Sequence, residues 1–118
     1  MQQSDLIRLR HMLDAAREAV AFSAGRGPDD FRRDRVLTLA LVKCIEIIGE
    51  AASRVSAETR AAHGGIPWSE AVAMRNRLVH GYFDVDLDRV WDTVVDDLAR
   101  LVPELQRAVV AGETEGSC

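Results

Sequence analysis

Apolar residues recur at three- and four-residue intervals along most of the chain, which is the spacing of one face of an α-helix. The two clearest series are Leu6, Leu9, Leu13, Ala16 and Val20 near the start, and Leu87, Val90, Val94, Leu98, Leu101, Leu105 and Val109 near the end. No segment of the sequence alternates with the two-residue period of a β-strand. The pattern therefore predicts an all-α protein.

Helix-capping and helix-breaking residues divide this pattern into four helices. The expected N-caps are Ser4 for the first helix, Asp29 or Asp30 for the second, Ser69 for the third and Asp86 for the fourth. Pro103 is expected to kink the fourth helix or to divide it in two. We predict one domain over residues 1–110, an up-and-down four-helix bundle, followed by a disordered acidic tail over residues 111–118.

The second helix is apolar on almost every side between Val36 and Val55. A helix of this kind must be covered from several directions, and a second subunit would do this better than three companion helices alone. We therefore expect a homodimer. Glu46, Glu50 and Ser53 interrupt the apolar surface at positions i, i+4 and i+7. This polar stripe either lines a cleft or simply faces solvent.

Composition limits the possible classes of protein. The 118 residues suffice for one domain, and 47% of them are hydrophobic. No apolar run approaches the length of a membrane span, and the polar start does not resemble a signal peptide, so we expect a cytoplasmic protein without membrane contact. Cys44 is interpreted as a core residue, and with Cys118 at the end of the sequence we expect neither a disulfide nor a metal site.

The formal net charge of −4 argues against an unselective nucleic-acid binder, which is typically basic. The charge is uneven, because residues 1–60 hold ten Lys and Arg against nine Asp and Glu, whereas residues 61–118 hold five against ten. Any RNA would have to bind a local basic cleft, selectively or weakly, and the binding should be sensitive to salt.

Four polar residues carry the candidate chemistry: Arg75, Asn76, His80 and Tyr82. Arginine is a permanent cation whose shape suits phosphate oxygens, and histidine gives and takes protons near neutral pH. His80 follows Arg75 by five positions, which would place it about 140° around the axis of a regular helix from Arg75. The two groups can converge if the helix loosens near Gly81, or if a two-fold axis brings two copies of the motif into one groove.

This motif resembles the Arg-x4-His-x-Tyr motif of HEPN-domain ribonucleases, and the resemblance is closest to the HepT toxin subfamily. The resemblance extends over about residues 4 to 110 and includes Ile47 to Ala52, Ile66-Pro67-Trp68, Met74-Arg75-Asn76 and Val90-Trp91. It implies an endoribonuclease that uses neither metal nor cofactor. It also implies a partner, an MntA-type nucleotidyltransferase antitoxin, in a hetero-oligomer of undetermined size.

The resemblance and the chemistry together suggest a role for each motif residue. Arg75 and His80 are the expected catalytic pair: His80 acts as general base or acid while a 2′-hydroxyl attacks phosphorus, and Arg75 stabilises the phosphoryl charge. Asn76 and Arg77 are expected to bind RNA, although Arg77 is also readable as a surface charge. Tyr82 either bonds a phosphate or, as the resemblance implies, receives AMP from the antitoxin and so silences the toxin.

Two other interpretations stay open. An arginine and a histidine near a helix C-terminus are often no more than favourable partners for its carbonyl groups. The acidic balance also fits a non-catalytic helical subunit of a nucleotidyltransferase complex, which binds nucleotide or presents Tyr82 without cutting RNA. A bare dimerisation module is a third reading, and it leaves Arg75 and His80 unexplained.

Overall fold

The computed structural model describes residues 1–80 and 84–116, with side chains described over residues 1–78 and 85–115. The elements follow the order α1 (Gln3–Ser23), α2 (Pro28–Arg33), α3 (Arg35–Ser53), α4 (Ala57–Ala62), α5 (Trp68–Leu78), β1 (Val79–His80), β2 (Asp84–Val85), α6 (Leu87–Asp92), the π-helical segment η1 (Thr93–Leu98) and α7 (Ala99–Gly116). The molecule is elongated, with principal extents of 49 × 29 × 20 Å.

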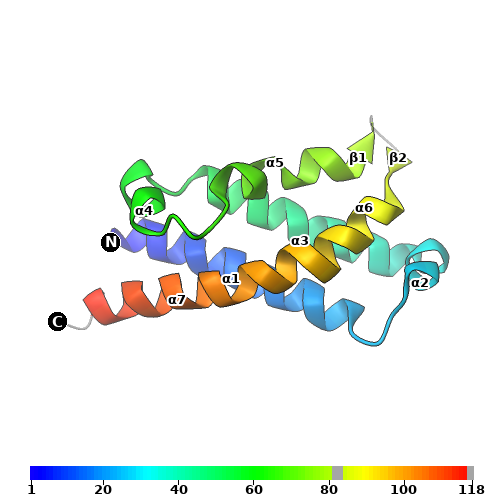
Figure 1. Ribbon diagram of the computed structural model, residues 1–118, viewed down its shortest axis with the longest axis horizontal. Coiled ribbons are helices and arrows are strands. Elements are labelled where there is room, and N and C mark those ends of the chain that lie inside the picture. Colours follow the sequence, from blue (N-terminus) through cyan, green and yellow to red (C-terminus); the bar gives the residue numbers. More distant parts are fainter. Residues whose placement is uncertain (81–83, 117–118) are drawn as a thin grey trace.

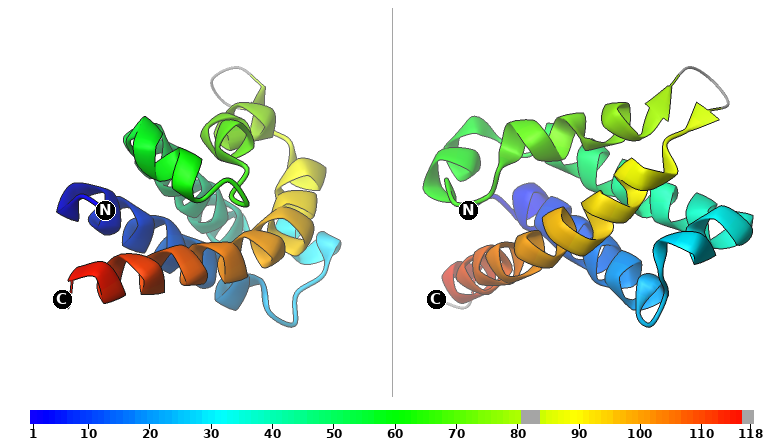
Figure 2. Two further views of the ribbon diagram at one scale, coloured as in Figure 1. Left: turned by 60° about the vertical axis from the view of Figure 1, so that its left-hand side comes forward. Right: turned by 45° about the vertical axis from the view of Figure 1, so that its right-hand side comes forward.

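Four long helical segments run up and down the molecule: α1, α3, α5, and the continuous series α6–η1–α7 (Figure 1). Helix α1 packs against both α3 and α7, while α5 packs against α3 on the other side (Figure 2). The predicted all-α four-helix bundle is therefore confirmed. The largest fully buried side chains come from every one of these segments and from α2: Leu9, Met12, Phe31, Leu41, Ile45, Ile48, Leu78, Val90, Leu98 and Leu105.

The second predicted helix is divided in two. Asp34 adopts an extended backbone with φ −110° and ψ 91°, and its carboxylate accepts a hydrogen bond of 3.0 Å from the Leu37 N–H. It is thus the N-cap of α3, whereas Asp30 accepts from the Gly27 N–H at the start of the short helix α2. The prediction of one continuous helix from residue 29 or 30 was wrong because a local cap at Asp34 restarts it.

Two further N-caps differ from the predicted ones. Helix α1 begins at Gln3 with Gln2 in the cap position, so Ser4 lies inside its first turn. Helix α5 begins at Trp68, so Ser69 is also inside a helix rather than at its start. Asp86 is the N-cap of α6 as predicted, and its carboxylate accepts from the Arg89 N–H at 3.1 Å.

The C-terminal helix differs from its prediction in two respects. Helix α7 continues across Pro103, and the irregular segment is the π-helical η1 one turn earlier. Pro103 cannot donate to the Ala99 carbonyl, and Ala99 is the first residue of α7, directly after η1. The tail expected from residue 111 is helical as far as Gly116, because Gly112 packs against Met1 and Leu6 of the opposite end of the chain.

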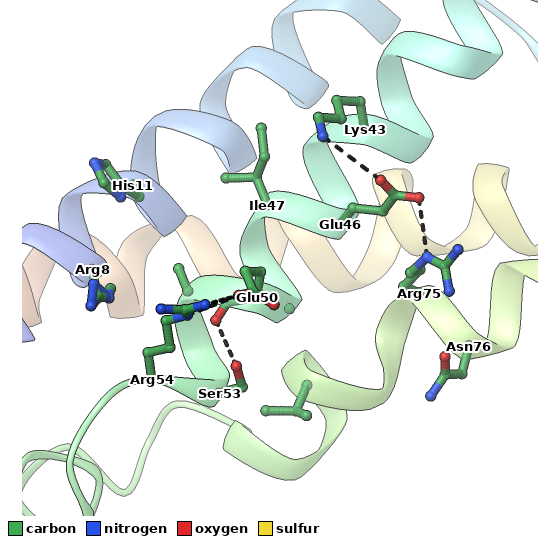
Figure 3. A pocket seen from close by; sticks show the side chains of 13 residues that line it. Arg8, His11, Lys43, Glu46, Ile47, Glu50, Ser53, Arg54, Arg75 and Asn76 are labelled. Atoms are coloured by element: carbon green, nitrogen blue, oxygen red, sulfur yellow. Dashed lines mark hydrogen bonds and ion pairs between the residues drawn. The ribbon is translucent and has the colours of Figure 1, made fainter.

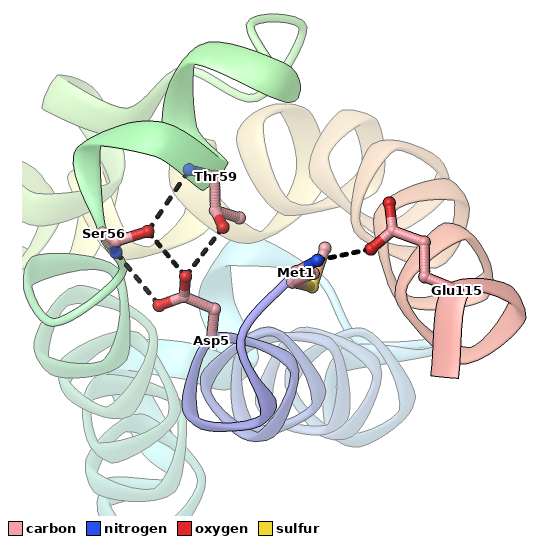
Figure 4. Close-up of polar contacts among 5 residues, drawn as sticks. All are labelled: Met1, Asp5, Ser56, Thr59 and Glu115. Carbon is pink, nitrogen blue, oxygen red and sulfur yellow. Dashed lines mark hydrogen bonds and ion pairs between the residues drawn. The ribbon is translucent and has the colours of Figure 1, made fainter. Parts of the chain in front are cut away.

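A buried carboxylate joins α1 to α4, a short helix that the sequence pattern did not predict. Asp5 is 2% exposed and accepts hydrogen bonds from the Ser56 N–H, the Ser56 hydroxyl and the Thr59 hydroxyl at 3.0, 2.6 and 2.7 Å (Figure 4). Burial acts to raise the pKa of the Asp5 carboxyl, but these hydrogen bonds and the charge of Arg8 together outweigh it, and the pKa lies below its ordinary value.

Candidate functional site

A surface groove of about 660 Å³ runs between α1, α3 and α5. Helix α3 forms its floor, with Glu46, Glu50 and Ser53 among the lining residues (Figure 3). Of the two interpretations of this polar stripe, the one in which it lines a cleft is therefore confirmed. The motif helix α5 forms one side of the groove through Arg75 and Asn76.

Gly49 sets the separation of α3 and α5. A Cβ atom at this position would lie 3.3 Å from the Ala71 carbonyl oxygen and 3.4 Å from that of Val72, both of which belong to the α5 backbone. Most real Cβ atoms do not approach other atoms so closely, and a helix backbone cannot move aside as a flexible side chain can. The absence of a side chain at Gly49 thus allows α5 to bring Arg75 against the floor of the groove.

Arg75 is held at this position by an acid on α3. Its Nε donates a hydrogen bond of 3.0 Å to Glu46 Oε1, while Lys43 Nζ lies 4.0 Å from the other oxygen of the same carboxylate (Figure 3). The Arg75 side chain remains 52% exposed. The hydrogen bond to Glu46 uses Nε, so the two Nη groups can still donate to a phosphate.

Asn76 and Arg77 lie on different sides of α5. Asn76 is exposed and lines the groove beside Arg75. Arg77 is exposed but outside the groove lining, on the side of α5 that faces Asp97. Burial and the charge of Glu70 raise the pKa of the Asp97 carboxyl above its ordinary value, while the charges of Arg100 and Arg77 oppose this rise. The geometry therefore places Asn76, and not Arg77, next to Arg75.

The chain leaves helical geometry directly after α5. Helix α5 ends at Leu78, and Val79 and His80 form β1, which pairs antiparallel with β2 so that His80 is opposite Asp84. The helix was expected to loosen near Gly81, and it ends slightly earlier. The 140° separation of a regular helix therefore does not apply between Arg75 and His80. The His80 side chain and the whole of Tyr82 lie outside the described residues, so their convergence on Arg75 stays a prediction.

Three residues interpreted from the sequence as core or packing residues occupy such positions. Cys44 is buried, and burial raises the pKa of its thiol. Trp68 is buried, and its indole N–H donates to the carbonyls of Arg60 and His63. Trp91 is half-buried and packs edge-on against Phe31, with ring centroids 5.2 Å apart.

The sequence did not single out the opposite side of the groove. Arg8 and His11 of α1 and Arg54, the C-cap of α3, line it together with Lys43 (Figure 3). The available signal was the spacing on each helix, because residues 8 and 11, and residues 43, 46, 50 and 54, each share one helical face. The pairing of α1 with α3 that unites these faces is a tertiary contact, which spacing alone does not reveal.

Neither a membrane span nor a metal cluster is found in the part of the chain that the structure describes. No helix there is long and apolar enough to cross a bilayer. No group of three or more His, Cys, Asp and Glu side chains is placed to hold a metal ion within residues 1–78 and 85–115.

The fold and the groove define a class of protein: a helical bundle that presents an Arg-x4-His motif at the end of its third long helix. The family model described as ribonuclease HepT-like matches residues 12–109. The chain therefore belongs to the ribonuclease HepT-like family, and the endoribonuclease class that the sequence predicts is confirmed at the level of the family.

Individual relatives agree with this membership. A candidate RNase of Caldanaerobacter subterraneus subsp. tengcongensis is 37% identical over 101 residues, covering 86% of this chain and 87% of the relative. A protein assigned as ribonuclease HepT of Thermococcus cleftensis is 35% identical over 79 residues, covering 67% and 72%. A candidate RNase of Methanocaldococcus jannaschii is 28% identical over 111 residues, covering 92% of both chains. No solved structure matched this chain.

Proposed function

We propose that this chain is the toxin of a toxin–antitoxin pair and cuts RNA in the cytoplasm without a metal ion. Its catalytic groups are Arg75 and His80, and the active form is a homodimer in which the two copies of the motif face a shared groove between the protomers. The observation that carries this proposal is the position of Arg75, held by Glu46 through Nε with more than half of its side chain exposed to the groove. Membership of a ribonuclease family supports it.

The reaction follows from the two groups. The 2′-hydroxyl of one nucleotide attacks the adjacent phosphorus, and the bond from phosphorus to the 5′-oxygen of the next nucleotide breaks. An imidazole takes the proton of the 2′-hydroxyl or delivers a proton to the departing 5′-oxygen, and His80 fills one of these roles. Arg75 stabilises the charge on the non-bridging oxygens, and Asn76 orients the phosphate. The products are a 2′,3′-cyclic phosphate and a 5′-hydroxyl.

The test is an RNA-cleavage assay in excess chelator with wild type, Arg75→Ala and His80→Ala. We expect both variants to lose activity by about 10² to 10⁴-fold, the usual contribution of a general acid–base or charge-stabilising group. His63→Ala is the matched control, because His63 lies outside the groove lining. Undiminished cleavage by His80→Ala, with native helix content by circular dichroism, would remove the assignment.

Tyr82 is the proposed site of control. A nucleotidyltransferase antitoxin of the MntA type would join AMP to its phenol, and the added bulk and negative charge would repel RNA from Arg75. Co-expression with such an enzyme, followed by intact-mass measurement, should show one or more AMP additions on wild type. Tyr82→Phe removes only the acceptor oxygen and should keep its unmodified mass. An adduct that persists in Tyr82→Phe would contradict this site.

The acidic net charge is also compatible with a second function, that of a non-catalytic helical subunit of a nucleotidyltransferase complex. The two functions differ in toxicity on expression. A nuclease should stop growth of the host, and Arg75→Ala should relieve this. A helical subunit should bind the nucleotidyltransferase tightly and be harmless both as wild type and as the Arg75 variant.

A further inference from the structure

Arg8 on α1 forms no ion pair within 4 Å among the described residues, although its charge is close enough to Asp5 to help lower the pKa of that carboxyl. Arg8 is half-buried, it lines the groove, and its Nε is the one buried side-chain nitrogen or oxygen with no hydrogen-bond partner among the described side chains. Asp5 is one turn earlier on the same helix, but its two carboxylate oxygens already accept from Ser56 and Thr59. A buried N–H without an acceptor is uncommon in folded proteins, and this N–H would gain an acceptor if the Arg8 side chain turned toward a phosphate in the groove.

His11 and Arg54 extend the same side of the groove. His11 follows Arg8 by three residues, lines the same groove and is exposed. Arg54 is paired with Glu50 at 2.7 Å, but both side chains are more than half exposed. An exposed pair four residues apart on one helix is weak, and a phosphate can replace its carboxylate. The three residues are called the α1-side cluster below.

The charge of the groove is opposite to that of the chain. Four lining residues are basic (Arg8, Lys43, Arg54 and Arg75), and two are acidic (Glu46 and Glu50). The chain as a whole carries a formal charge of −4. The groove is therefore a local basic region on an acidic protein, as a polyanion-binding site on such a protein must be.

The α1-side cluster and Arg75 lie toward different ends of the groove (Figure 3). Arg75 is bound to Glu46, and Arg54, the C-cap of α3, follows Glu46 by eight residues, although its guanidinium reaches back to Glu50. At 1.5 Å per residue this is about 12 Å along the helix axis. A ligand with several anionic groups in a row, such as the backbone of a nucleic acid, could contact both ends of the groove at once.

We propose that Arg8, His11 and Arg54 form a second phosphate-binding subsite that holds the RNA backbone one or more nucleotides from the scissile phosphate. The inference rests on the proposed ribonuclease function and explains how the site binds a polymeric substrate. The Arg8 and Arg54 guanidinium groups donate to non-bridging phosphate oxygens, and the His11 imidazole donates to the same phosphate or to a ribose hydroxyl. The subsite contributes affinity for longer RNA and takes no part in bond cleavage.

The experiment compares Arg8→Gln/Arg54→Gln with Arg10→Gln. Arg10 is on the same helix and outside the groove lining, where it pairs with Glu113 at 3.5 Å. Binding of a fluorescent single-stranded 12-nucleotide RNA is measured by anisotropy in the His80→Ala background, which prevents cleavage. We expect the double variant to bind about tenfold or more weakly, because charge-assisted hydrogen bonds are lost. The slope of log Kd against log salt should become shallower by about 0.7 for the lost phosphate contact.

A second substrate separates the subsite from catalysis. A dinucleotide with a single phosphodiester reaches only the Arg75 end, so its kcat/KM in the otherwise wild-type protein should be unchanged by Arg8→Gln/Arg54→Gln. Cleavage of the 12-nucleotide RNA should show a raised KM with an unchanged kcat.

Three results would overturn the subsite. The double variant Arg8→Gln/Arg54→Gln could bind the 12-nucleotide RNA as tightly as Arg10→Gln, or it could lose as much activity on the dinucleotide as on the 12-nucleotide RNA. It could also differ from wild type in molecular mass in solution, which would show that the cluster is a contact between two copies of the chain. Full cleavage by both Arg75→Ala and His80→Ala would instead refute the catalytic proposal. The anisotropy comparison would still decide whether the α1-side cluster binds RNA.

Discussion

Two carboxylates each hold a distant part of the chain, and they do so in different surroundings. Asp5 is 2% exposed and joins α1 to α4 through three hydrogen bonds. Glu46 keeps 33% of its side chain exposed and joins α3 to α5 through one hydrogen bond to Arg75, itself 52% exposed. The Asp5 contact is buried and uses both carboxylate oxygens, whereas the Glu46 contact is exposed to solvent.

The difference separates a contact that stabilises the fold from one that can exchange its partner. A buried carboxylate that accepts several hydrogen bonds is costly to disrupt, because its partners would be left unpaired. An exposed ion pair contributes little, because water and salt screen it. Arg75 can therefore release or share its contact with Glu46 when a phosphate arrives, while Asp5 cannot leave Ser56 and Thr59 without loss of stability.

The largest expected effect is on the Asp5 contact. Asp5→Ala leaves the Ser56 N–H and two hydroxyl groups without their acceptor and should lower the free energy of unfolding by about 3 kcal/mol. Urea denaturation monitored by circular dichroism measures it. Asp14→Ala is the control, since Asp14 is an exposed acid on the same helix, and it should change stability by no more than about 0.5 kcal/mol. Equal effects of the two variants would contradict the comparison.

A bulkier residue at position 49 should damage the groove and leave the Asp5 contact unchanged. Gly49→Val places side-chain atoms against the α5 carbonyls of Ala71 and Val72, and this should lower the free energy of unfolding by about 2 kcal/mol. RNA cleavage measured below the unfolding transition should fall as well, because α5 carries Arg75. Gly64→Val is the matched control, because a Cβ there would meet only the Ala61 carbonyl oxygen, at an ordinary contact distance of 4.0 Å. A stable and fully active Gly49→Val protein would show that close approach of α5 is not required.

The dependence of stability on pH should show a smaller part of the Asp5 contribution. The pKa of Asp5 is lower in the folded protein than in the unfolded chain, so the unfolded chain binds more protons as pH falls through the ordinary carboxyl range. The contribution is fully present above that range and is lost as pH falls through the folded pKa. Urea titrations at several acidic pH values should show a shallower decline for Asp5→Asn than for wild type. Parallel declines would indicate that the pKa of Asp5 is not lowered by folding.

The smallest effect is expected at Glu46. Glu46→Gln keeps an oxygen acceptor for the Arg75 Nε and removes one negative charge from the groove. Stability should change by no more than about 0.5 kcal/mol, and RNA should bind about two- to fivefold more tightly at low salt, because one exposed repulsion is removed. Glu113→Gln, which alters the exposed pair with Arg10, should leave RNA affinity unchanged. If both variants bound RNA more tightly, the effect would come from the net charge of the protein and not from the position of Glu46 in the groove.

Features set by local sequence were predictable, and features set by packing between distant segments were not. The cap at Asp86 follows from the residue itself, and the end of α5 near residue 80 was expected because Gly81 disfavours a longer helix. The restart at Asp34 is local too, but Asp29, Asp30 and Asp34 are all good caps, and the pattern does not choose between them. The helical end of α7 depends on Gly112 against Leu6, a contact across almost the whole sequence.

The candidate site divides in the same way. Arg75 and Asn76 were found because the motif is contiguous and chemically distinctive, and both line the groove. Arg8 and Arg54 were missed because arginines on helix surfaces are common and neither belongs to a motif. Only the packing of α1 beside α3 shows that they share a groove with Arg75.

The two ends of the described chain meet at one pole of the molecule. The Met1 amino group lies 2.6 Å from Glu115, and Figure 1 shows the hairpin of β1 and β2 at the opposite pole. A tether or fusion partner attached at either end would therefore project away from the hairpin. The protein can be anchored to a sensor surface by its N- or C-terminal residue with the motif end of α5 directed into solution.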